Sequence, residues 1–151
     1  MVFYKLIHVL SVTLWVGGMF FAYMVLRPTA AEVLQPPERL KLWNSAFKRF
    51  FNWVWLLIYL LLVTGFYMVY LFGGLLHVPT YIHLMLVLGM AMLLVFIFLF
   101  FRLYVRFSLS VSRQEWKQAG ETLVGIRKLV ALNLVLGILT FAVAILGRGG
   151  I

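Results

Sequence analysis

Two histidines lie inside long apolar stretches of the chain, where histidine is uncommon. His8 belongs to the segment IHVLSVTLWVGGMFF at residues 7–21, and His83 belongs to PTYIHLMLVLGMAMLL at residues 79–94. A neutral imidazole nitrogen is a good ligand for transition metals, and polar residues inside a membrane are functional by default. Two such side chains that met could occupy both axial positions of a haem iron.

The composition places both histidines in a membrane. Hydrophobic residues make up 65% of the 151 residues and charged residues only 11%, with a mean hydropathy of +1.07. Residues 6–26, 50–101 and 129–147 carry no charge. Because a helix needs about 20 apolar residues to cross a bilayer, the long middle stretch holds two spans, separated at the Gly- and Pro-containing turn 73–81. The sequence therefore predicts four spans, at about residues 3–26, 50–72, 80–103 and 127–147.

Positive charge is concentrated in two of the three loops between these spans. Of the 13 Lys and Arg residues, five lie in the first loop and six in the third, whereas the second loop has none. Basic residues in short loops stay on the cytoplasmic side, so both termini and the second loop are predicted to face the periplasm of a bacterial inner membrane. The net charge of +9 is mostly a consequence of this topology, and it also favours attraction to anionic lipids of the bilayer. Nucleic acid is not a predicted partner.

Both basic loops are predicted to extend the spans as cytoplasmic helices. Pro37 stands at a suitable first helical position before the second span, and SRQE at residues 112–115 matches a capping box before the fourth. The absence of cysteine excludes disulfides and thiolate metal sites. The predicted fold is all-α, a single-domain integral membrane bundle of four transmembrane helices over residues 1–151, N-out and C-out.

This topology places the two histidines at similar depths, because both spans enter from the same side. His8 and His83 each lie four or five residues below the outer surface, which at about 1.5 Å per residue matches them to within a turn. The residues His8, Ser11, Trp15, Gly18 and Ala22 of the first span recur at helical spacing and become small towards the middle of the membrane. This face suits a flat macrocycle with bis-histidine ligation, although glycine also serves ordinary helix packing.

Donors for the propionate groups of a haem are present at the same outer level. Tyr4 and Lys5 begin the first span, Tyr81 begins the third, and Arg148 ends the fourth. Their positions predict charge-assisted hydrogen bonds to carboxylates. The alternative is that the two cations extend to lipid headgroups.

The methionines provide a rival interpretation, because thioether sulfur is a soft donor that can pass copper(I). His8 and His83 would then form the entry site. Methionine also fills space in apolar cores, and Met90 and Met92 point about 200° apart on a helix. The candidate sulfur donors are Met19, Met24, Met68, Met85, Met90 and Met92.

Other polar and aromatic residues in the spans have weaker interpretations. Asn52 and Asn133 lie at matched depth near the cytoplasmic side, where they are expected to hydrogen-bond across the bundle. Trp53, Trp55 and Tyr59 either line the pocket or a quinone-like site, or contact lipid.

Four segments together resemble the copper resistance protein D (CopD) family and its four-helix relatives over nearly the whole chain. They are IHVLSVTLWVGGMFF, RFFNWVWLLIYLLLVTGFY, PTYIHLMLVLGMAMLL and IRKLVALNLVLGILTFAVAILGR. A more distant similarity runs to the four-helix protoporphyrinogen oxidases of the HemJ type, which bind haem b. By this resemblance His8 matches their first-span haem ligand, and Trp15, Gly18 and Phe20 match the motif that follows it.

The third span departs from the pattern of these oxidases. They have His-x-Lys where this chain has His83, Leu84 and Met85, so the lysine implicated in their activity is absent. The resemblance leaves His83, with Met85 as the alternative, as the second axial ligand.

Three functions follow from these residues. The first is a haem b protein with bis-histidine ligation, acting in electron transfer or redox sensing with a quinone or a periplasmic redox partner. The second is copper transport or resistance, and the third is porphyrinogen oxidation. The sequence leaves enzymatic activity, catalytic residues and oligomeric state open.

Overall fold

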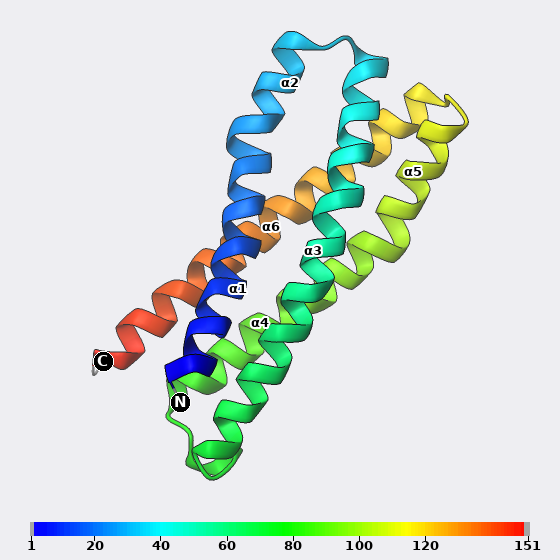
Figure 1. Cartoon of the computed structure of the whole chain (residues 1–151). Coiled ribbons are helices and arrows are strands. Elements are labelled where there is room, and N and C mark those ends of the chain that lie inside the picture. The colour runs from blue at the N-terminus through cyan, green and yellow to red at the C-terminus, as the bar shows by residue number, and fades with distance from the viewer. Residues whose placement is uncertain (1, 150–151) are drawn as a thin grey trace.

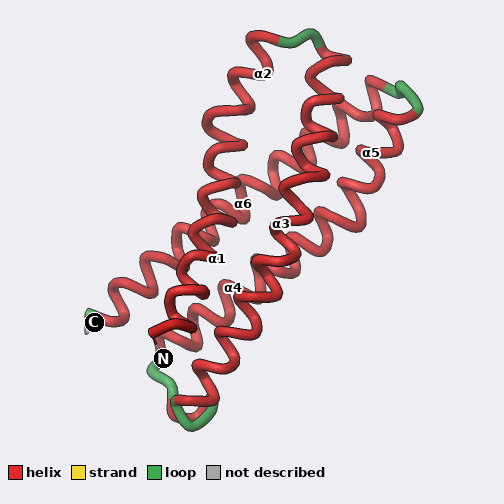
Figure 2. Tube along the Cα trace, viewed as in Figure 1, coloured by secondary structure: helices red, strands yellow, loops and turns green. Residues whose placement is uncertain are grey.

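The chain folds into four long helical rods joined by short turns (Figures 1 and 2), with no strand in the part of the computed structural model that is described, residues 2–149. The first rod is α1 Val2–Phe20, a π-helical turn η1 Phe21–Leu26 and α2 Arg27–Val33. The second is α3 Pro36–Leu71. The third is α4 Thr80–Phe98, a π-helical turn η3 Leu99–Tyr104 and α5 Val105–Ser112, and the fourth is α6 Trp116–Arg148; a 3-10 turn, η2 Leu75–His77, precedes α4.

Each rod is long and apolar enough to cross a membrane, which confirms the predicted class of fold. The rods extend past the predicted spans at one end of the bundle, called here the basic end, where the connections at residues 34–35 and 113–115 lie. Both termini and the connection at residues 72–79 lie at the opposite end (Figure 1). This arrangement is the one that four successive antiparallel spans require.

The two local predictions for the basic end had different outcomes. Helix α3 begins at Pro36, one residue before the predicted first position at Pro37, and it extends the second span at this end as predicted. The capping box at residues 112–115 is wrong, because Ser112 still belongs to α5 and its hydroxyl donates to the Leu109 carbonyl at 2.7 Å. Gln114, with φ of +59°, turns the chain, and α6 begins after Glu115 without a side-chain cap.

Aromatic rings fill the middle of the bundle and its basic half. Trp15 on α1 meets Phe96 on α4 edge to face, with ring centroids 6.1 Å apart, and Phe96 meets Phe51 on α3 at 5.5 Å. Phe51 in turn packs against Tyr104 at 5.1 Å and stacks on Phe47 at 5.1 Å. These contacts tie three rods together with bulky, rigid side chains.

The closest helix pairs are α4 with α6 and α1 with α3. Gly18 of α1 allows one of these approaches, because a Cβ at this position would collide with the Phe50 ring of α3. The small residue predicted to make room for a porphyrin therefore makes room for a neighbouring helix. Open space lies instead nearer the termini, where the four rods surround a cavity.

Candidate functional site

A cavity of about 390 Å³ opens between the rods at the end opposite the basic end. Its walls come from α1, α3, α4 and α6, and most of its lining is apolar. Trp15 and Met92, which are both buried in the core, lie at its inner side, so the aromatic core closes the cavity towards the basic end. The lining residues with polar or sulfur atoms in their side chains are Lys5, His8, Trp15, Met68, Tyr81, Met85, Met90, Met92, Thr140 and Arg148.

His8 is oriented by a hydrogen bond from α1 to α3. Its Nδ1 lies 2.9 Å from Oγ1 of Thr64, and the Thr64 hydroxyl donates to the Leu60 carbonyl at 2.6 Å. The hydroxyl has a single proton, and Leu60 takes it, so Oγ1 accepts from His8. Nδ1 therefore carries the proton of the neutral ring, and the lone pair of Nε2 remains free.

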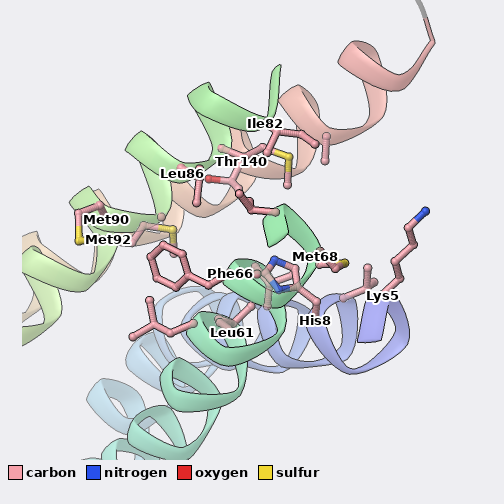
Figure 3. A pocket seen from close by; sticks show the side chains of 18 of the residues that line it. Lys5, His8, Leu61, Phe66, Met68, Ile82, Leu86, Met90, Met92 and Thr140 are labelled. Atoms are coloured by element: carbon pink, nitrogen blue, oxygen red, sulfur yellow. The ribbon is translucent and has the colours of Figure 1, made fainter. Parts of the chain in front are cut away.

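Gly65 fits closely against the same imidazole ring. A Cβ at this position would lie 3.2 Å from Cε1 and 3.7 Å from Nδ1 of His8. Thr64 and Gly65 thus hold the ring from one helix, through a hydrogen bond and through close contact. Figure 3 shows the ring projecting among the lining side chains, near Met68.

His83 does not join His8 in this cavity. It is exposed on α4 and is not among the lining residues, whereas Met85, two positions later, is half-buried and lines the cavity. Two residues correspond to about 200° of rotation on a helix, so only one of the two can face inward. The structure therefore brings together His8 and Met85, the alternative to His83, and leaves His83 on the outer face.

Three of the four predicted propionate donors line the cavity, and one does not. Lys5, Tyr81 and Arg148 lie around the outer part of the cavity, where Figure 3 shows the Lys5 side chain extending away from His8. Tyr4 does not line it and packs instead on the Tyr67 ring, with centroids 4.4 Å apart.

Of the remaining first-span residues, Trp15 lines the cavity, as expected from the helical face on which it lies. Ser11 is buried, with 2% of its surface exposed, but it lies outside the lining. Gly18 contacts the second rod through Phe50 and also lies outside.

Sulfur atoms gather around the cavity more than their spacing in the sequence suggests. Four of the six candidate methionines line it: Met68 on α3 and Met85, Met90 and Met92 on α4. Met19 is buried in the core and Met24 is exposed. Within residues 2–149 no group of three or more His, Asp or Glu side chains could hold a metal ion. Besides His8, the cavity lining offers four soft thioethers and the hydroxyl groups of Tyr81 and Thr140.

Other polar residues lie away from the cavity. Asn133 on α6 donates to the Met92 carbonyl on α4 at 3.2 Å, so the expected hydrogen bond across the bundle is confirmed for Asn133, whereas Asn52 is exposed. Trp53, Trp55 and Tyr59 are not among the lining residues. His77 is exposed, and its Nδ1 donates to the Gly73 carbonyl at 3.0 Å.

The comparison with known proteins gives one match. No curated protein and no solved structure shows a significant match to the chain. The family model described as copper resistance protein D matches residues 44–146, which include most of α3 and nearly all of α6. The match covers more than half of the chain and leaves α1, with His8, outside it. The chain therefore belongs to the copper resistance protein D (CopD) family of membrane proteins.

Proposed function

We propose that this protein handles copper, and that it binds copper(I) in the cavity through Nε2 of His8 and methionine sulfur. The observation that carries the proposal is that Thr64 leaves Nε2 of His8 free within a cavity lined by four methionines. Membership of the copper resistance protein D family supports copper as the metal.

The donor set suits the chemistry of this ion. Copper(I) is a soft cation that favours thioether and imidazole ligands, whereas magnesium, calcium and manganese favour carboxylates. All of these donors are neutral, so binding places one positive charge in the cavity. The apolar walls limit access of water, and the flexible methionine side chains can adjust to the few ligands that copper(I) takes.

The closed inner end of the cavity suggests the order of events. Copper(I) would enter from the side on which Lys5 and Arg148 lie and reach His8 first. Trp15 and the aromatic rings behind it block further passage in this conformation. Transfer towards the basic end would therefore require these rings to move, and without such movement the protein would hold the ion.

A direct test is copper(I) binding by the detergent-purified protein under reducing, oxygen-free conditions. Titration against a chromogenic copper(I) chelator is expected to show one bound ion per chain. X-ray absorption should then detect both nitrogen and sulfur around the copper. A protein that never competes with the chelator would contradict the proposal.

A second candidate, haem b binding, is favoured by the cations that surround the same cavity. Nε2 of His8 and the sulfur of Met85 would hold the haem iron, while Lys5 and Arg148 would pair with carboxylates of the ring. Haem would supply one-electron chemistry with a quinone or a periplasmic redox partner. Porphyrinogen oxidation has less support, because the oxidase lysine is replaced here by Met85.

The visible spectrum distinguishes haem from copper. A haem protein purified from haem-replete cells is red, with a Soret band that shifts on reduction. A colourless protein that stays colourless after addition of haemin would leave copper(I) as the ligand to test.

The Thr64 hydrogen bond yields a prediction for copper affinity. Thr64→Val keeps the shape of the side chain but removes the acceptor for Nδ1 of His8, so the ring loses its fixed tautomer. Copper(I) affinity is expected to fall by roughly tenfold, the usual effect of removing a group that orients a metal-binding histidine. Chelator competition measures the change.

Thr140→Val is the matched control for this variant. Thr140 also lines the cavity, but its hydroxyl donates to the Leu136 carbonyl of its own helix, at 2.8 Å. Its replacement should leave copper(I) affinity unchanged. An equal loss in both variants would show that cavity polarity matters and that orientation of His8 does not.

A further inference from the structure

Three arginines from three helices lie in the basic half of the bundle, within range of one another's charges. Arg27 begins α2, Arg39 lies on α3 and Arg127 lies on α6, and each is half-buried. The charged or ionisable side chains within electrostatic range of Arg127 are Arg27, Arg39 and Tyr23, and no carboxylate is among them. The cluster is thus an excess of positive charge drawn from separate parts of the chain.

The polar atoms of this cluster are incompletely satisfied. Nε of Arg127 is buried and has no hydrogen-bond partner. The Arg27 guanidinium lies over the Tyr23 ring, 4.9 Å from its centroid, so the aromatic ring covers one face and leaves the N–H groups at the edge available. A guanidinium has five N–H donors and no acceptor, so neighbouring arginines cannot satisfy one another.

Arginine does not relieve this repulsion by losing its proton, because it stays charged under all ordinary conditions. Partial burial makes both the repulsion and the unpaired donor more costly than they would be in water. An anion with several acceptor oxygens removes both costs. Phosphate oxygens match the planar N–H pairs of arginine and form charge-assisted bonds with them.

We propose that Arg27, Arg39 and Arg127 form a binding site for a phosphate group. The proposal is independent of copper or haem binding, since these arginines lie outside the His8 cavity. Arg27 directly follows the apolar stretch 6–26, and Arg127 lies two residues before the stretch 129–147. The site therefore lies at the depth of lipid headgroups, so its phosphate would come from an anionic phospholipid or from free phosphate in solution.

Thermal unfolding of the full chain in non-ionic detergent tests this site. Added phosphatidylglycerol is expected to raise the unfolding temperature in a saturable way, and phosphatidylcholine, which has no net charge, should do so much less. Arg127→Gln and Arg39→Gln should each weaken the effect of phosphatidylglycerol by roughly tenfold, because a charge-assisted bond is lost. Arg113→Gln, an equal charge change at an exposed position of the same end, should leave it unchanged.

The sign of the effect without any anion separates a binding site from a structural role. In phosphate-free buffer and non-ionic detergent, Arg127→Gln should unfold at the same temperature as the wild type or higher, because it removes repulsion. Inorganic phosphate that stabilises the wild type as much as phosphatidylglycerol does would identify free phosphate as the ligand. Equal stabilisation of wild type and Arg127→Gln, or a variant that unfolds earlier without anions, would overturn the proposal.

Discussion

Replacing His8 with alanine is expected to lower copper(I) affinity by roughly a hundredfold or more, since even an orienting group outside the metal ligands is worth tenfold to a hundredfold. His8 is the one imidazole in the cavity lining among the described residues, and Nε2 is its free donor. The remaining methionines bind through sulfur alone. Chelator competition measures the loss, and X-ray absorption should show nitrogen missing from any copper that still binds.

His83→Ala is the control for this variant, because it also removes an imidazole, at the similar depth in the membrane that the sequence predicts. His83 is exposed on α4 and lies outside the cavity, so copper(I) affinity should stay within about twofold of the wild type, which corresponds to less than 1 kcal/mol. If instead both alanine variants lose binding equally, the two histidines act together, as the bis-histidine hypothesis requires. Loss of copper(I) binding in His8→Ala alone supports the arrangement in which His8 faces the cavity and His83 does not.

The depth of each residue in the membrane follows from the sequence, whereas its rotation about the helix axis does not. Charge-free lengths and loop charges place His8 and His83 at one level, and both are near the same end of the bundle. The third span is apolar on every side, however, so no amphipathic pattern indicates which face turns inward. Packing of α4 against α6 decides that question, and it turns Met85 inward in place of His83.

The sequence also does not identify a residue that orients a side chain on another helix. Thr64 lies 56 positions from His8, and nothing in the second span marks it as a partner. The only available signal was a hydroxyl residue next to a glycine in an apolar span. A threonine in a membrane helix usually bonds to its own backbone, as Thr64 also does through Leu60, so this signal is weak.

The methionines are scattered in the sequence, yet four of them line one cavity in the structure. Met90 and Met92 point in different directions along α4, which argued against a shared site. The cavity is wide enough to reach both, with Met90 at its exposed border and Met92 buried at its inner end. The width of a cavity depends on how far the four rods separate from one another. The spacing of residues along one rod does not predict this separation.

The double substitution of Met68 and Met85 with leucine gives the second large effect. Leucine has nearly the volume of methionine, so the fold should be retained, but two of the four sulfur donors that line the cavity are removed. A loss of roughly tenfold for each thioether would lower copper(I) affinity about a hundredfold. Chelator competition gives the affinity, and X-ray absorption should report fewer sulfur neighbours.

Met19→Leu and Met24→Leu together form the control for this double variant. They change the same number of methionines, one buried in the core and one exposed, and neither lines the cavity. Copper(I) affinity should be unchanged in the control. If the control loses binding as well, the effect arises from the packing of the bundle, and the cavity is not the copper site. If both methionine double variants keep copper(I) affinity while His8→Ala loses it, binding requires the imidazole and does not require the sulfur atoms.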